Sequence, residues 1–447
     1  MAKQSVRYAC TNCGAQYSSW AGKCSQCGEW NTIQEEVQLV DANTSASSRP
    51  IVVHTIKESI NKPEERMATG FKDIDDVLGG GIVKGGVTLV AGQPGIGKST
   101  LLLQLANAVA QSESVLYVSG EESAHQIGMR ANRMKTHAEQ LSIATSNSAN
   151  EVASAIATKK YQFVVVDSIQ TMQAQGLSSP PGSVTQITNS THLLLQAAKQ
   201  SNTALVIVGH VTKEGSIAGP KLLEHIVDVV LTFDGEAYGG LKLLRAAKNR
   251  FGPTTESAIL EMTQKGLEIV TNPSQSLLEE RQATDGSVVL AALEGTRPVL
   301  VEVQALVNKT SFGYAKRAAS GYDQGRLQLL VAMLERRTKL QLSDHDIYVN
   351  IVGGLKIQDP AADLAICMAI GSAAKGLQLN QNAVVFGEVG LSGEVRHVPF
   401  IEKRIAEAEK LGFDIAIGPK LRTKGRQSAF LHPVTDVRTA LNEFLKK

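Results

Sequence analysis

Short hydrophobic runs alternate with helical patterns along the middle of the chain, from about Thr69 onward. Each run holds five to seven residues rich in Val, Ile, Leu and Phe, which is typical of buried strands. Parallel strands need a long crossover between them, so strands that alternate with helices predict a mostly parallel sheet. The predicted strands are Val87–Ala91, Val115–Ser119, Phe163–Asp167 and Ala204–His210, and the first helix is Lys98–Ala110.

The pattern changes twice further along the chain. Three strands follow one another without helices, at Val227–Phe233, Leu241–Ala246 and Ser257–Met262. A turn-rich segment at Thr271–Ser274 then indicates a boundary, and a second αβ unit begins at about Asp285. The predicted divisions are a module at 1–30, a linker at 31–60, a domain at 61–272 and a domain at 285–447.

The composition narrows the class of protein. The chain has 447 residues, of which 43% are hydrophobic, and this fraction excludes wholesale disorder. Its 45 basic and 43 acidic residues almost balance, but a local basic stripe is enough to bind nucleic acid. No hydrophobic run reaches the roughly 20 residues of a membrane helix. Met1–Cys10 also lacks the apolar stretch of a signal peptide, so we expect a cytoplasmic protein without a membrane partner.

Four of the five cysteines form two CxxC pairs that are separated by ten residues. Zinc prefers four tetrahedral ligands, and each CxxC turn supplies two thiolates. Without an export signal, the pattern indicates a structural zinc site whose metal supplies most of the folding energy of residues 1–30. Trp20 and Trp30 are expected to pack against this site, with stacking on bases as the alternative. The four expected zinc ligands are Cys10, Cys13, Cys24 and Cys27.

The segment Gly92–Ser99 matches the phosphate-binding pattern GxxxxGK[ST]. It follows a predicted strand and opens a predicted helix, which is the context that wraps backbone N–H groups around phosphates. We expect Lys98 to reach the β- and γ-phosphates of ATP, and Ser99 to hold Mg²⁺. The predicted nucleotide-binding residues are Gly92, Gln93, Pro94, Gly95, Ile96, Gly97, Lys98, Ser99 and Thr100.

Two acidic positions complete the predicted site. Asp167 ends a hydrophobic strand and is expected to hold Mg²⁺ through water. Hydrolysis also needs a group that orients the attacking water, and Glu121 and Glu122 follow the strand Val115–Ser119, which we place next to the phosphate loop. We favour Glu121 for this role. The alternative is an exposed charged pair at a helix N-terminus, stabilised by the helix dipole.

Three further segments carry a family resemblance. Thr69–Phe71 and Gly79–Gly81, followed by the phosphate loop, resemble the ATPase core shared by RecA, the DnaB-type replicative helicases and the KaiC proteins. Lys248–Gly252, with the sequence KNRFG, resembles the signature of the RadA (Sms) family of bacterial DNA repair proteins. The resemblance implies an α/β fold with a RecA-like P-loop ATPase core, an N-terminal four-cysteine zinc module and a C-terminal α+β domain similar to Lon protease.

The same resemblance implies a function. It implies a hexameric ring that uses ATP to move on single-stranded and branched DNA, and branch migration of recombination intermediates together with the RecA recombinase. Glu121 matches the catalytic glutamate of the helicase relatives. His210 matches the polar residue that senses the γ-phosphate in those relatives, and a purely structural hydrogen-bonding role is the alternative.

Lys248 and Arg250 follow the predicted strand Leu241–Ala246, far in sequence from the phosphate loop. In rings of this class ATP lies between subunits, so a cation from a neighbour can stabilise the charge that develops on the γ-phosphate. The planar guanidinium of Arg pairs well with phosphate oxygens. We therefore expect Lys248 and Arg250 to act across a subunit boundary, with a solvated strand end as the alternative.

Two loops are expected to face the pore of such a ring. They are Ser168–Val184 and Thr212–Leu223, which follow two of the predicted strands. In the second loop, Lys213 and Lys221 are candidates for contacts with DNA phosphates.

The C-terminal unit resembles a peptidase but lacks its nucleophile. Leu391–Val395 and the helix Ile401–Leu411 resemble the protease domain of Lon. In that family the nucleophilic serine follows a proline, whereas here Pro360 is followed by Ala361. A methyl group cannot attack a carbonyl, so we expect a scaffold for ring assembly and no proteolysis.

Seven basic residues and two acidic ones lie between residues 305 and 340. This excess predicts a patch for the DNA backbone, with a plain solvated face as the alternative. Two other functions stay open: a non-motor, ATP-gated signalling or binding ring, and an ATP-dependent peptidase, against which Ala361 argues. The basic residues are Lys309, Lys316, Arg317, Arg326, Arg336, Arg337 and Lys339, and the acidic ones are Asp323 and Glu335.

Overall fold

The computed structural model describes residues 7–10, 16–17, 22–30, 33–36, 55–56, 64–210, 221–235, 240–311, 313–421 and 429–446. The chain divides into two compact units, Met1–Pro63 and Glu64–Lys447, and each is described by itself. The first unit contains a small antiparallel sheet in which β1 (Arg7–Cys10) lies between β2 (Gln16–Tyr17) and β3 (Ile33–Glu36).

The second unit is built on a nine-stranded sheet with the order β14-β13-β12-β11-β6-β10-β9-β7-β8. The six strands from β11 to β8 run parallel, which confirms the predicted mostly parallel sheet, and β12, β13 and β14 add an antiparallel edge. The strands are β6 (Val87–Gly92), β7 (Val115–Ser119), β8 (Leu141–Thr145), β9 (Phe163–Asp167), β10 (Ala204–His210), β11 (Val229–Gly235), β12 (Leu241–Asn249), β13 (Ser257–Thr263) and β14 (Gly266–Ile269).

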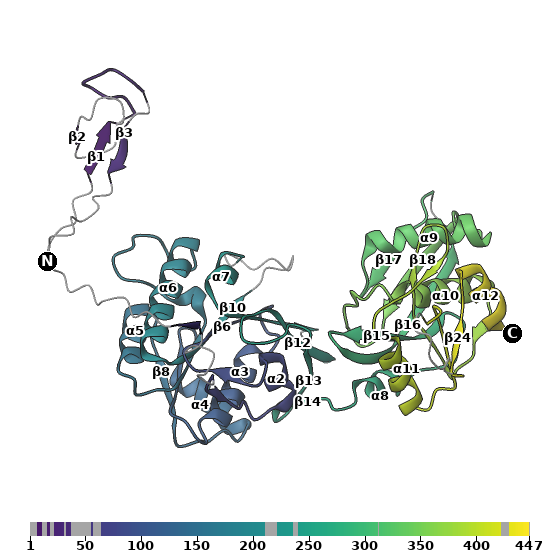
Figure 1. The fold of residues 1–447 in the computed structure, drawn as a ribbon, viewed down its shortest axis with the longest axis horizontal. Helices are drawn as coiled ribbons and strands as arrows, with labels where there is room; N and C mark the ends of the chain where they lie inside the picture. Colours follow the sequence, from purple (N-terminus) through teal and green to yellow (C-terminus); the bar gives the residue numbers. More distant parts are fainter. Residues whose placement is uncertain are drawn as a thin grey trace. The chain divides into compact units, whose positions relative to one another are not determined.

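Helices cover both faces of this sheet (Figure 1). One face packs against α2 (Lys72–Leu78), α3 (Lys98–Val109) and α4 (Ala124–Arg133), and the other against α5 (Ala149–Ala157), α6 (Val184–Ser201) and α7 (Lys221–Ile226). Coverage of both faces explains why β6, β7 and β9 are buried at every position instead of alternating with polar residues. A two-stranded ribbon of β4 (Arg66–Met67) and β5 (Ile82–Val83) precedes the sheet.

Two predictions about this sheet are wrong. The strand that leads to Glu121, β7, does not lie next to the phosphate-loop strand β6, because β10 and β9 are inserted between them. In addition, β12 continues to Asn249, so Lys248 lies inside a strand instead of after one. Both errors arise because strand order and strand length depend on pairing partners that are distant in the sequence.

The C-terminal half carries a seven-stranded mixed sheet with the order β17-β18-β16-β15-β20-β23-β24. The almost fully buried helix α10 packs against the central strands β15 and β16, with α9 and α12 beside it. Helices α8 and α11 also pack against these strands. The strands are β15 (Ser287–Glu294), β16 (Arg297–Lys309), β17 (Arg317–Ser320), β18 (His345–Ile351), β20 (Ala383–Val385), β23 (Ile415–Gly418) and β24 (Leu431–Pro433). The helices are α8 (Pro273–Leu278), α9 (Gln324–Thr338), α10 (Ala362–Lys375), α11 (Ile401–Lys410) and α12 (Val437–Phe444).

The two halves of the second unit share hydrophobic core. Leu241, Leu243 and Ile259, from β12 and β13, pack into the same buried cluster as the strands of the C-terminal sheet. The Arg297 guanidinium also donates to Asp73 Oδ2 at 2.9 Å, which ties β16 to the start of α2. Apolar burial of this kind favours one continuous body from Glu64 to Lys447.

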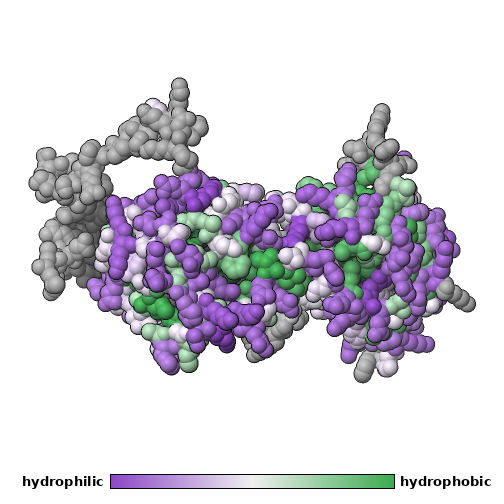
Figure 2. Space-filling model, turned by 90° about the horizontal axis from the view of Figure 1, so that it is seen from below, coloured by the Kyte–Doolittle hydropathy of each residue, from purple (hydrophilic) through white to green (hydrophobic). Residues whose placement is uncertain are grey.

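The surface is mainly polar. In the view of Figure 2 hydrophilic residues predominate, and hydrophobic residues form small separate areas. In the described parts of the chain, none of the helices has both the length and the apolar character that crossing a bilayer requires.

Candidate functional site

The loop between β6 and α3 places backbone N–H groups at the start of a helix of twelve residues. Gly97, the residue before the helix, has a φ of 113°, a conformation that strains any residue with a Cβ. At the other end of the loop, a Cβ on Gly92 would lie 2.5 Å from the Phe233 carbonyl oxygen of β11. The two glycines therefore let the chain turn sharply and lie against the neighbouring strand.

Lys98 is the charged centre of this loop. Its side chain is 4% exposed, and Nζ donates to the carbonyl oxygens of Gly92 and Gln93, each at 2.9 Å. Burial lowers the pKa of Lys98 to about 8, and the negative charges of Asp167 and Glu121 offset part of this effect. The ammonium group is thus held by two backbone carbonyl oxygens, and the charges of two carboxylates act on it.

Asp167 ends β9 and is itself buried. Its Oδ2 accepts a hydrogen bond of 2.6 Å from the Tyr117 hydroxyl, which comes from the neighbouring strand β7. Burial, followed by the charge of Asp167, raises the pKa of Tyr117 well above its ordinary value, so the phenol stays protonated and donates. Tyr117 fixes the orientation of the predicted Mg²⁺-binding carboxylate.

Glu121 lies in the turn after β7 and approaches the end of β9. The Ser168 hydroxyl donates to Glu121 Oε1 at 2.6 Å, and His210 Nε2 lies 3.5 Å from the same oxygen. In the sheet, Ser119 pairs with Asp167, and His210 pairs with Gly92. The carboxyl ends of β6, β10, β9 and β7 therefore bring Lys98, His210, Asp167 and Glu121 to one edge, although β7 is two strands further away than predicted.

The residues present fit a Mg²⁺–nucleotide complex. A buried ammonium group and a helix N-terminus suit phosphate. The buried carboxylate of Asp167 and the hydroxyl of Ser99 supply the oxygen ligands that Mg²⁺ prefers. The Ser99 hydroxyl and Asp167 would hold the metal ion, which would neutralise phosphate oxygens as the leaving group departs.

Sequence reasoning missed Tyr117 and Ser168. Tyr117 is one apolar residue within a buried strand, and Ser168 is the polar residue that follows another, so nothing local distinguishes either residue. The signal that could have found them is the parallel pairing of β7 with β9, which brings Tyr117 of β7 close to Asp167 and brings Glu121, after β7, close to Ser168, after β9.

Lys248 and Arg250 stand at the opposite edge of the sheet. Val230 pairs with Lys248, and Val229 pairs with both Asn249 and Thr88, which belongs to the start of β6. Four residue steps along β6, roughly 13 Å at the rise of a strand, separate Thr88 from Gly92. The two cations therefore cannot reach the phosphate loop of their own chain.

The contacts of these two cations differ. Lys248 Nζ donates to the carbonyl oxygens of Glu224 (2.6 Å) and Val227 (2.7 Å), and burial lowers its pKa. Arg250 is more than half exposed, with a single ion pair of 3.3 Å to Asp228, which also binds Lys199. Arg250 is thus the cation that is free to leave its contact.

The rest of the KNRFG segment docks on the glycine-rich turn after α2. A Cβ on Gly252 would lie 2.7 Å from the Cα of Gly79, and the reverse substitution would be as close. The Arg66 guanidinium donates to the Phe251 carbonyl oxygen at 2.8 Å. This close backbone packing explains why both segments contain glycine, and it fixes the position of Arg250.

The small N-terminal unit shows part of the predicted zinc site. Cys24 is fully buried, and the backbone N–H of Cys27 points to its Sγ at 3.5 Å. A hydrogen bond with the Tyr17 hydroxyl, 3.0 Å from Cys24 Sγ, is the main cause that lowers the pKa of Cys24 to about 6. Since zinc binds the thiolate, these features fit the metal.

The other half of that site cannot be compared with the prediction. The side chain of Cys10 and all of Cys13 lie outside the described residues, and so does Trp20. Among the residues that the structure describes, no group of three metal-binding side chains occurs. Trp30 is 67% exposed, with the Lys23 ammonium over its ring, so the prediction that it packs into the site is wrong.

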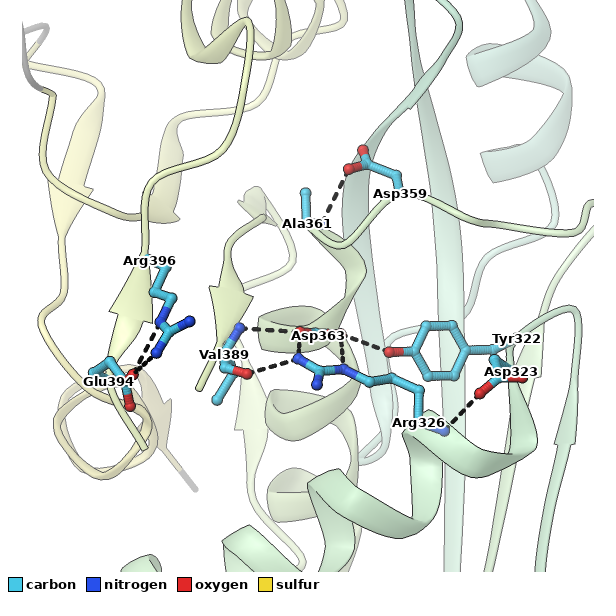
Figure 3. Close-up of polar contacts among 9 residues, drawn as sticks. All are labelled: Tyr322, Asp323, Arg326, Asp359, Ala361, Asp363, Val389, Glu394 and Arg396. Carbon is cyan, nitrogen blue, oxygen red and sulfur yellow. Dashed lines mark hydrogen bonds and ion pairs between the residues drawn. The ribbon is translucent and has the colours of Figure 1, made fainter. Parts of the chain in front are cut away.

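Ala361 occupies the position at which a peptidase of the Lon type would carry serine. It is buried, and its backbone N–H donates to Asp359 Oδ1 at 3.0 Å. Two residues later, Asp363 accepts hydrogen bonds from the Tyr322 hydroxyl (2.6 Å) and the Val389 N–H (3.0 Å), and it pairs with Arg326 (Figure 3). These contacts hold α9, α10 and β21 (Glu388–Val389) together, whereas the position of the peptidase serine carries only the methyl group of Ala361.

One residue of the predicted DNA patch, Arg326, belongs to this network of contacts around Asp363. The Arg326 guanidinium binds Asp363 and the Val389 carbonyl oxygen, so it is not available to contact DNA phosphates. Of the predicted pore loops, 168–184 is described, whereas 211–220 and the Lys221 side chain lie outside the described residues.

Three protein families match this chain. Residues 60–216 match the family described as AAA domain, residues 8–35 a rubredoxin metal-binding domain, and residues 327–421 the ChlI subunit of magnesium chelatase. Together with the parallel sheet and the phosphate loop, these matches confirm the predicted fold class, and the AAA-domain match supports ATP hydrolysis.

Curated relatives match over nearly the whole chain. A DNA repair protein RadA from Aquifex aeolicus is 43% identical over 99% of both chains. Proteins of the same name from Bacillus subtilis and Pseudomonas aeruginosa are each 46% identical, over 95% and 94% of this chain and 94% of their own length.

The lowered pKa of Lys98 predicts how nucleotide affinity depends on pH. As pH rises through about 8, the nucleotide-free chain loses the Lys98 proton, whereas bound phosphate favours the ammonium form. The dissociation constant for a fluorescent ADP analogue should therefore rise by up to roughly tenfold per pH unit above that point. In Lys98→Arg the guanidinium stays charged, so a pH dependence as steep as that of the wild type would contradict the assignment.

The two CxxC pairs, of which the structure describes Cys24 and Cys27, predict one zinc atom per chain. Cys27→Ser should release the metal, which plasma emission analysis would detect, and should leave the thermal unfolding of residues 64–447 unchanged, because that unit has its own core. The buried Cys367 provides the matched control, since Cys367→Ala should retain the zinc. A metal-free wild type, or zinc retained in Cys27→Ser, would contradict the site.

Proposed function

Since this chain belongs to the RadA family of DNA repair proteins, we propose that it is a DNA-dependent ATPase motor of helicase type that acts on single-stranded and branched DNA. In this proposal it promotes branch migration of recombination intermediates together with the RecA recombinase. The working form is a hexameric ring in which ATP, with Mg²⁺, lies between adjacent subunits. The zinc module folds around one Zn²⁺ ion held by Cys10, Cys13, Cys24 and Cys27.

One observation carries the proposal. Lys98, Asp167 and Glu121 stand together at one edge of the sheet, while Lys248 and Arg250 stand at the other. Each edge of the sheet would then supply half of a phosphate site. Such a site is complete only when two copies of the chain meet with opposite edges facing each other. This arrangement favours a ring over a monomeric ATPase.

The side chains divide the work of hydrolysis. Glu121 accepts a proton from the attacking water, whose oxygen forms the new bond to the γ-phosphorus as the bond to the bridging oxygen breaks. Lys98 balances the negative charge on the β- and γ-phosphates. Arg250 from a neighbouring subunit balances the charge that develops only during transfer, and Lys248 holds the segment that carries Arg250.

DNA contacts come from two regions in this proposal. The loop 168–184 and residues 212–223 line the pore of the ring, and the basic residues at 309–339, apart from Arg326, contribute phosphate contacts outside it. His210, at the end of β10, links the second of these segments to the nucleotide edge.

The proposed function is tested by ATP turnover with and without single-stranded DNA. We expect an oligonucleotide of thymidines to raise turnover several-fold, and we expect Lys98→Ala to abolish turnover in both conditions while the protein stays folded by circular dichroism. Lys98 acts on phosphate charge, so its loss removes binding and catalysis without removing core packing. Turnover that does not respond to DNA would favour the non-motor ring, and casein cleavage by the protein would favour the peptidase.

Arg250→Ala should lower turnover by up to a factor on the order of 10³, because the lost charge acts in the transition state. Affinity for ATP should change little, since the cation gains its contact mainly as charge develops. The matched control is Lys199→Ala, which removes the other cation from Asp228 but nothing from a subunit boundary. Equal losses in the two variants would show that Arg250 only neutralises Asp228, and the trans role would be wrong.

A further inference from the structure

The Ser168 hydroxyl connects the ends of two neighbouring strands. Ser168 directly follows Asp167 at the end of β9, is fully buried, and donates to Glu121 Oε1 at 2.6 Å. Glu121 belongs to the turn after β7. The proposed catalytic carboxylate is therefore oriented by a residue of a different strand.

The backbone around Gly120 makes this contact possible. The Gly120 N–H donates to the Asp167 carbonyl oxygen at 2.9 Å, which joins the ends of β7 and β9. A Cβ on Gly120 would lie 2.1 Å from Thr171 Oγ1, so only glycine lets the short helix η1 (Ile169–Thr171) approach. The Ser119 hydroxyl oxygen, in turn, accepts the Glu122 N–H at 2.9 Å and shapes the turn that carries Glu121.

The direction in which Glu121 points suits catalysis. Both Ser168 and His210 contact Oε1, so neither of these groups occupies Oε2. The side chain is 46% exposed, and its negative charge acts on the Lys98 ammonium. Ser168 thus holds one carboxylate oxygen, while the other can accept a proton from water next to the phosphate loop.

Ser168 is also the first residue of the segment that leads to α6. Thr171 Oγ1 donates to the Ser168 carbonyl oxygen at 2.9 Å, so the first turn of the segment is bonded directly to Ser168. Further along, the Gln173 N–H donates to the Asn147 carbonyl oxygen at 2.7 Å, and residues 175–178 are exposed. Residues 169–174, which include the short helix η1, thus connect Ser168 to the exposed part of the segment.

We propose that Ser168 is a positioning residue that orients the Glu121 carboxylate toward the attacking water. In this proposal the orientation of Glu121 depends on the conformation of the segment 169–183. The proposal rests on the proposed function, since it names the route by which single-stranded DNA against that segment raises ATP turnover. A ligand on the segment can act in this way only by favouring a position of Ser168 that orients Glu121 differently from the position in this structure.

A purely structural serine would behave differently. If the hydroxyl only satisfied a buried polar group, its loss would lower the free energy of unfolding and leave the chemical step unchanged. A hydroxyl that orients a general base affects the rate instead, because displacement of a catalytic group by about 1 Å costs up to roughly a hundredfold in turnover.

The test compares Ser168→Ala with Ser168→Thr, which keeps the hydroxyl, and with Ser190→Ala, which removes an equally buried serine hydroxyl from α6. Turnover is measured with and without an oligonucleotide of thymidines, together with the affinity for ATP. For Ser168→Ala we expect turnover with DNA to fall about ten- to a hundredfold at nearly unchanged ATP affinity. The ratio of turnover with DNA to turnover without DNA should approach one, whereas Ser190→Ala should behave like the wild type.

Three results would overturn the proposal. These are unchanged turnover in Ser168→Ala, a loss of turnover with an unchanged response to DNA, or an equal loss in a folded Ser168→Thr. Should Ser168→Thr not fold, the double variant Ser168→Ala with Glu121→Gln decides the matter. If Ser168 acts through Glu121, the second substitution adds nothing to the residual rate of Glu121→Gln, and a further loss of the same factor contradicts the proposal.

The design separates this proposal from the proposed function. If the wild type does not respond to DNA, the DNA-dependent motor is wrong, and the proposed route for DNA falls with it. The basal rates of Ser168→Ala and Ser168→Thr still show in that case whether Ser168 positions Glu121. If the wild type responds to DNA and Ser168→Ala responds equally, the motor stands and the role of Ser168 is wrong.

Discussion

The buried ammonium group of Lys98 is the charge on which the nucleotide edge depends. Taking an ammonium group out of water is costly, and here two carbonyl oxygens and the charges of Asp167 and Glu121 offset that cost only in part, as the lowered pKa shows. A bound phosphate would supply the remaining negative charge that offsets the cost of burying the Lys98 ammonium group. The same ammonium group therefore explains why the loop binds nucleotide and why two carboxylates from other strands gather beside it.

The parallel sheet determines which charged residues lie near Lys98 and which lie at the opposite edge. Parallel strands place all carboxyl ends on one side, so the phosphate loop and the acidic residues meet there, while the antiparallel strand β12 returns the KNRFG segment to the other side. The close packing of Gly79 on Gly252 holds that segment in place. In the proposed ring, a single chain would therefore carry two complementary halves of a site that face in opposite directions.

The part of the site that is local in sequence could be predicted, and the part that depends on pairing could not. The phosphate loop and Asp167 follow from glycine spacing and from an acid at a strand end, which are both short-range patterns. The position of Glu121 two strands further from the loop, the inclusion of Lys248 in β12, and the roles of Tyr117 and Ser168 depend on which strands pair. Most of the parallel strands and the helix after the phosphate loop can be recognised one at a time, although β8 is not among the predicted strands. The order of the strands in space, by contrast, is a property of the whole core.

The central claim is that the two edges meet around one nucleotide, and a structure of the DNA-bound protein with ADP and aluminium fluoride tests it most directly. The account predicts that Lys98 and Glu121 of one subunit face the fluoride group from one side. It also predicts that Arg250 of the adjacent subunit has left Asp228 and donates to the fluoride from the other side. Arg250 still paired with Asp228 at every nucleotide, in an assembled ring that hydrolyses ATP, would contradict the claim.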